Sequence, residues 1–137
     1  MVEWMANSGG IVIDFARVKQ YLDAIADANG EIATSPHRRF WNVDYQAFVV
    51  GKVPNVVAGG QPVPIIDHRD PLRSPFFLIL QGGWGGLPQM PTAGPYITDP
   101  TFEVDLPDGS AASGQEILAG LTAWLQNGYP EHSPPGP

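Results

Sequence analysis

The densest group of side chains that could take part in chemistry is the run Asp67-His68-Arg69-Asp70. Two carboxylates and one imidazole lie within these four residues, and they could act as a general acid or base or could supply two oxygen ligands and one nitrogen ligand. Neighbouring residues converge on one point only when a turn directs them there. A solvated loop in which Asp70 bonds local backbone amides before Pro71 is the interpretation we favour. Asp67, His68 and Asp70 are kept as catalytic candidates.

A second group is the basic patch formed by His37, Arg38 and Arg39. It could bind a small anion or pair with the acidic second half of the chain, and we favour the pairing. His37 is also a candidate acid or base for a small enzyme. Only three histidines are present and one lies in the C-terminal tail, so there is little choice of catalytic base. The sequence contains no Gly-x-Ser-x-Gly nucleophile elbow, and enzymatic activity is not the leading prediction.

Composition excludes several further classes of chemistry. The chain of 137 residues has no cysteine, so thiol catalysis, disulfides and thioether-linked haem are ruled out. Its formal net charge is −7, and residues 74–137 contain no Lys or Arg. A surface of this sign repels phosphate backbones and anionic lipids, which disfavours binding to nucleic acid or to a membrane. A basic or cationic partner would suit the second half, although the charge could simply maintain solubility.

The acidic residues of the second half resemble a calcium site in composition only. Asp99, Glu103, Asp105 and Asp108 do not follow the spacing of an EF-hand loop. We therefore predict no metal site.

Four segments show the apolar spacing and the capping residues of helices. Asp14 can cap the first, in which apolar residues recur every three or four positions. Ser113 and Glu116 form a capping box at the start of the last. The predicted helices cover residues 14–28, 44–50, 74–80 and 113–127, with a buried strand as the alternative for the third.

The connections between these helices are rich in proline and glycine. Residues 52–66 are predicted to form an extended loop and not a sheet, because Pro54, Pro62 and Pro64 remove backbone donors. Residues 82–114 are predicted to form a long ordered loop with one short strand at 102–106. The expected fold is therefore mainly α, a bundle of four helices over residues 1–131 as one domain, followed by a disordered tail at 132–137.

In order and spacing, the motifs of the later chain resemble those of class I cytochrome c-like domains from large bacterial multidomain proteins. The matching elements are Gly59-Gly60, Val63-Pro64-Ile65-Ile66, Asp70-Pro71-Leu72-Arg73-Ser74, Phe77 to Leu80, Met90-Pro91, Glu116-Ile117 and Trp124-Leu125-Gln126-Asn127-Gly128. The resemblance implies a cytochrome c-like bundle. It also implies a Cys-x-x-Cys-His haem attachment motif, where this chain has Ala33-Thr34-Ser35-Pro36-His37. Only the histidine of that motif is present.

The resemblance therefore implies a scaffold without covalent haem. We expect an accessory or protein-binding module with no cofactor, whose partner is another protein such as an oxidoreductase subunit. Trp84, which lies between glycines, and Trp41 are the expected partner contacts. The alternative is an electron carrier in which His37 and Met90 ligate a non-covalent haem. The N-terminus lacks a secretory signal, so a cytoplasmic location is expected, with the periplasm left open.

Overall fold

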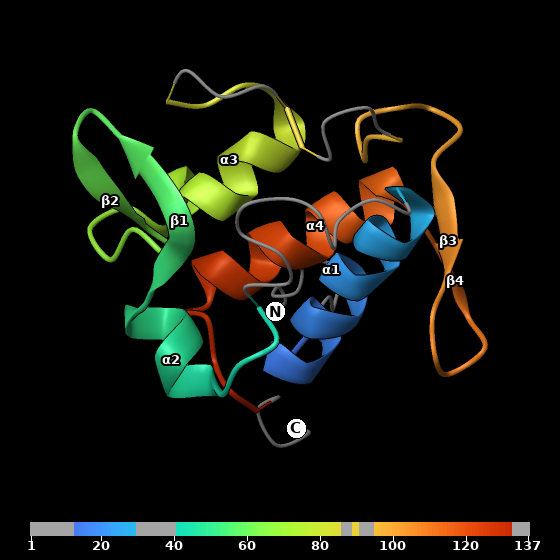
Figure 1. The fold of residues 1–137 in the computed structure, drawn as a ribbon. Coiled ribbons are helices and arrows are strands. Elements are labelled where there is room, and N and C mark those ends of the chain that lie inside the picture. Colours follow the sequence, from blue (N-terminus) through green and yellow to red (C-terminus); the bar gives the residue numbers. More distant parts are fainter. Residues whose placement is uncertain (1–12, 30–40, 86–88, 91–94, 133–137) are drawn as a thin grey trace.

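Helices and two β-hairpins share one buried core in the computed structural model (Figure 1). The structure describes residues 13–29, 41–85, 89–90 and 95–132. In chain order the elements are α1 (Phe15–Asn29), α2 (Tyr45–Val50), β1 (Lys52–Ala58), β2 (Gln61–Pro64), the 3-10 helix η3 (Pro71–Arg73), α3 (Pro75–Gln81), β3 (Glu103–Asp105), β4 (Ala111–Ser113) and α4 (Gly114–Gln126).

All four predicted helices are present. Oδ1 of Asp14 accepts the Arg17 amide at 3.0 Å, and Oδ1 of Asp44 accepts the Ala47 amide at 2.8 Å. Both predicted caps are therefore confirmed. At α4 the capping box is complete, because the side chains of Ser113 and Glu116 each accept a backbone amide of the other.

The start of α3 differs in one detail from the expectation. Ser74 occupies the N-cap position and Pro75 the first helical position, as predicted, but the Ser74 side chain makes no cap hydrogen bond. Its hydroxyl donates to the Pro71 carbonyl at 2.6 Å and accepts the Asp67 amide at 3.0 Å. Ser74 therefore ties the preceding turn to the helix, and it is fully buried.

The prediction of a mainly α bundle is wrong, because the described chain also contains two small antiparallel sheets. β1 pairs with β2 inside the segment 52–66 that was expected to be a loop. Each strand of a two-stranded hairpin has one unpaired edge, where the missing amide of a proline costs no ladder bond. Gly59 and Gly60 have φ values of 59° and 78°, which form the tight turn between the strands.

The second hairpin lies within the region 82–114 that was expected to be mostly loop. The short strand predicted at 102–106 is confirmed as β3, but its partner β4 was not predicted. Val104 pairs with Ala112, and both turn toward the interior. The turn is closed by the Leu106 amide, which donates to the Ser110 carbonyl at 2.8 Å. Figure 1 places this hairpin and the β1–β2 hairpin on opposite sides of the helices.

The core is centred on α1 and α4, which lie against each other (Figure 1). At one end of this pair the rings of Phe15 and Phe48 lie 5.1 Å apart, and Trp124 lies 6.1 Å from Phe48. Phe48 also contacts Phe76 of α3 at 5.5 Å. We call this region, together with Tyr45, His68 and Tyr129, the aromatic end. Burial of large rings in edge-to-face contact is the main stabilising interaction there.

Candidate functional site

The cluster at Asp67 to Asp70 is organised as a turn. Oδ1 of Asp67 accepts the amides of Arg69 and Asp70 at 2.9 and 3.2 Å. The Asp70 carbonyl accepts the Arg73 amide at 2.8 Å. The carboxylate of Asp67 is thus occupied in holding the local backbone, as in an Asx turn.

His68 points away from these carboxylates and joins two other segments. Its Nε2 lies 2.8 Å from the Val49 carbonyl, and its Nδ1 lies 2.8 Å from the Tyr129 hydroxyl. A carbonyl can only accept, so Nε2 carries a proton and donates it to the Val49 carbonyl. Tyr129 has a φ of 46°, and its carbonyl accepts the Tyr45 hydroxyl at 2.7 Å. His68 therefore links the end of α2 to the segment that follows α4.

The remaining predicted site residues are spread over the molecule. His37 lies outside the described residues, so its pairing with Met90 stays a prediction. Met90 is half-buried and donates its amide to the Ile79 carbonyl at 2.9 Å. Trp41 is 4% exposed and donates Nε1–H to Asp23 at 2.8 Å, so it offers no contact surface in this structure. Trp84 is half-buried.

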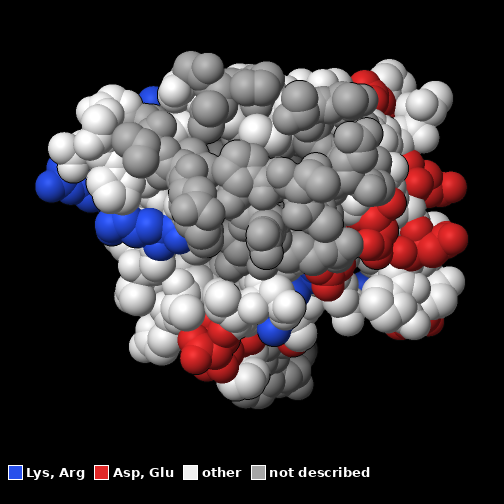
Figure 2. All heavy atoms as spheres, viewed as in Figure 1, with Lys and Arg blue, Asp and Glu red and all other residues white. Residues whose placement is uncertain are grey.

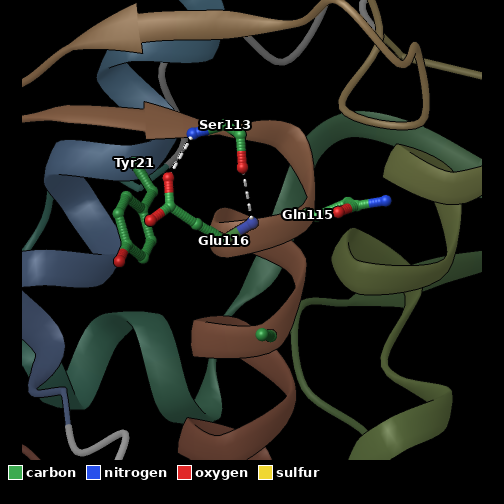
Figure 3. Close-up of a pocket in the computed structure, with 5 residues that line it drawn as sticks. Tyr21, Ser113, Gln115 and Glu116 are labelled. Atoms are coloured by element: carbon green, nitrogen blue, oxygen red, sulfur yellow. Dashed lines mark hydrogen bonds between the residues drawn. The ribbon is translucent and has the colours of Figure 1, made fainter.

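A pocket of about 340 Å³ opens where α1 meets the start of α4. Figure 3 shows the ring of Tyr21 on α1 beside the carboxylate of Glu116 on α4. The other lining residues are Ser113, Gln115 and Ala119. The capping box thus forms one wall of the pocket and fixes the Glu116 side chain by one of its oxygens, since Oε1 accepts the Ser113 amide at 2.8 Å.

Tyr21 is held in the pocket by close packing against α4. A Cβ placed on Gly120 would lie 3.0 Å from Cε2 and 3.3 Å from the hydroxyl of Tyr21, so a larger residue at this position would push the ring away by a few tenths of an ångström. Tyr21 is 9% exposed, and its hydroxyl makes no hydrogen bond within the part of the chain that the structure describes. Burial raises the pKa of Tyr21; Arg17 opposes this rise, while Glu116 and Asp108 add to it.

Arg17 ties α1 to the β3–β4 turn. Its Nη2 donates to Oδ2 of Asp108 at 2.8 Å, and its Cζ lies 5.9 Å from the Tyr21 ring centroid. Hydrogen bonds from the Ser110 side chain, from Arg17 and from the Ser110 amide hold the pKa of Asp108 well below its usual range. Asp108 thus remains a carboxylate at any ordinary pH, and it balances the charge of Arg17.

The exposed surface of the β3–β4 hairpin carries the acidic residues next to the pocket. Glu103 pairs with Ser113 and Asp105 pairs with Ala111, and side chains of cross-strand partners share one face. Glu103, Asp105 and Glu116 are all exposed. We call these three carboxylates the acidic face. Figure 2 shows acidic side chains gathered on this side of the molecule and basic ones standing out on the opposite side.

No protein-family model matches the chain, and no curated protein or solved structure is similar to it. The resemblance to cytochrome c-like domains therefore stays a prediction. The function has to be inferred from the chemistry of the site itself.

The described residues give no support for a metal site or for a membrane-spanning helix. Within them, no group of three or more His, Asp or Glu side chains could hold a metal ion. No helix in the described ranges is both long and apolar enough to cross a bilayer.

The sequence predicted the capping-box wall of this pocket but not the tyrosine that faces it. The Ser113–Glu116 capping box was predicted from the local spacing, but Tyr21 was not singled out. Its position three residues after Val18 places it on the apolar face of α1, which indicates burial without showing its neighbour. Gly120, inside the last predicted helix, is a sequence signal for a close approach.

Proposed function

We propose that this chain is a protein-binding module that holds a basic, extended segment of its partner on the acidic face. The observation that carries the proposal is the register of the β3–β4 hairpin. It presents Glu103 and Asp105 on one exposed face, next to the strand that leads into Glu116.

The spacing of these carboxylates favours an extended ligand. Alternate residues of a strand point to the same face and lie about 7 Å apart. A partner segment in extended conformation with a basic residue at every second position repeats at the same distance. Such a segment would place one cation opposite Glu103 and the next opposite Asp105.

The surrounding charge supports a cationic partner over an anionic one. From residue 74 onward the chain has no Lys or Arg that could neutralise this face. Arg17 approaches it but is paired with Asp108. Exposed pairs contribute modestly in a folded protein, yet several carboxylates of one sign raise the association rate and the selectivity for a basic partner.

Fluorescence anisotropy with a labelled peptide of alternating lysine and serine tests this proposal. We expect saturable binding at low ionic strength that weakens as salt is added. The double variant E103Q/D105N should lose most of the binding. The matched control D70N/E131Q removes the same charge from exposed positions elsewhere and should bind as the wild type does.

Two results would contradict the proposal. One is equal binding of a peptide in which glutamate replaces lysine. The other is an equal loss of affinity in the two double variants, since net charge alone would then explain the attraction.

A further inference from the structure

We infer that the pocket at Tyr21 and Glu116 binds a single guanidinium group, the head of an arginine side chain in the basic segment of the partner. This inference rests on the proposed function and names the residue type that the site selects. The pocket leaves two hydrogen-bonding groups without a partner among the described residues.

Two acceptors remain in the pocket once the internal bonds are counted. Oε1 of Glu116 accepts the Ser113 amide, while the other carboxylate oxygen has no hydrogen-bond partner among the described residues. The Tyr21 hydroxyl likewise has no partner there, and it is not one of the buried unpaired atoms of the described residues, so it is open to solvent. An acceptor that is open to solvent can exchange a hydrogen bond from water for one from a ligand.

An anion would be a poor ligand at this position. The first amides of a helix attract anions, but here Ser113 already accepts the Glu116 amide, and the Glu116 carboxylate already offsets the helix dipole. A phosphate or sulfate would therefore meet a carboxylate in place of free donors. The groups that the pocket offers are complementary to a cation that carries several donors.

The pocket has room for the head group of one side chain. A volume of about 340 Å³ is at the lower end of what small-molecule sites provide. An arginine head group is planar and has five donors in a fixed fork, so it can meet the Glu116 carboxylate and the Tyr21 oxygen together. Arg17 already lies over the Tyr21 ring, which shows that this ring accepts a guanidinium neighbour. Lysine is a point charge and should bind less well.

Chemical-shift titrations of the full chain with N-acetylarginine amide test the inference. We expect saturable shifts of the amides of Tyr21, Ser113 and Glu116. N-acetylcitrulline amide has the same shape without the charge and should produce none, and N-acetyllysine amide should bind more weakly than the arginine probe. Equal shifts with arginine and citrulline would overturn the inference without the need for any variant.

The variant Glu116→Gln separates charge from structure. A glutamine at this position still accepts the Ser113 amide and keeps the capping box, so the fold is retained. Affinity for the arginine probe should fall about tenfold, as expected for loss of one charged hydrogen-bond partner. Tyr21→Phe should lower the affinity for the arginine probe by a smaller factor, and Glu131→Gln should leave this affinity unchanged. Unaltered affinity in Glu116→Gln would refute the assignment.

This inference and the proposed function can fail separately. If the lysine-serine peptide binds the acidic face and the arginine probe does not bind, only the pocket assignment falls. If the peptide does not bind the wild type at all, the proposed function falls, whatever the probe does.

Discussion

The two ends of the α1–α4 pair differ in how completely their polar groups are paired. At the aromatic end, both ring nitrogens of His68, the Tyr45 hydroxyl and Nε1 of Trp124 all have hydrogen-bond partners. At the other end, which holds Tyr21, Glu116 and the acidic face and which we call the acidic end, the Tyr21 hydroxyl and one carboxylate oxygen of Glu116 have no partner among the described residues. Paired polar groups stabilise a fold, whereas unpaired ones are available to a ligand. We propose that the aromatic end maintains the structure and that the acidic end binds a partner.

The largest expected effect is on stability at the aromatic end. Trp124→Ala removes a ring that is 1% exposed and contacts Phe15, Phe48 and Tyr129, so it should lower the free energy of unfolding by about 3–5 kcal/mol. Glu116→Gln at the acidic end should change it by less than about 0.5 kcal/mol. Urea denaturation of both variants measures the difference. A Trp124→Ala variant as stable as the wild type would contradict the assignment of a structural role to this end.

A matched pair of tyrosine variants sharpens the comparison. Tyr129→Phe removes the hydroxyl that bonds His68 and should cost about 1 kcal/mol. Tyr21→Phe removes a hydroxyl without a partner in the described chain and should cost less than about 0.5 kcal/mol. The same urea titrations apply. If Tyr21→Phe proved the more destabilising of the two, the hydroxyl of Tyr21 would have a structural role and would not be free for a ligand.

The smallest effect concerns the acid dependence of stability. The pKa of Asp108 is lower in the folded chain than in the unfolded one, so its contribution to stability is present above about pH 4 and is lost as the pH falls below that value. Asp108→Asn should therefore show a flatter acid limb than the wild type when the unfolding midpoint is followed from pH 5 downward. Ser110→Ala removes the largest cause of the shift and should flatten the limb in part. A wild-type profile with the same slope as Asp108→Asn would contradict the hydrogen-bond network.

The sequence predicted the helices well because their signals are local. Asp14, Asp44 and the pair Ser113–Glu116 cap helices through residues at most three positions away. The fold class was wrong because strand pairing is not local. The extended loop predicted for residues 52–66 rests on the prolines, yet Gly59 and Gly60 form the tight turn of a hairpin whose unpaired strand edges tolerate proline.

The pocket could be predicted only in part, for the same reason. Glu116 was identified from its cap, whereas its contact with Tyr21 joins residues almost a hundred positions apart. No spacing rule gives the side on which two helices meet. The Asp67–His68 run was the strongest local signal for chemistry, yet the fold uses its carboxylate and its imidazole to hold a turn and to join two segments.

The most direct test of the central claim is a chemical-shift map of the chain titrated with the lysine-serine peptide. The shifted amides should cluster at Glu103 to Asp105 on β3 and at Ala111 to Glu116 on β4 and the start of α4. The amides around His68 and Tyr129 should not move. Shifts centred on the aromatic end, with the β3–β4 hairpin unaffected, would contradict the division of the molecule into a structural end and a binding end.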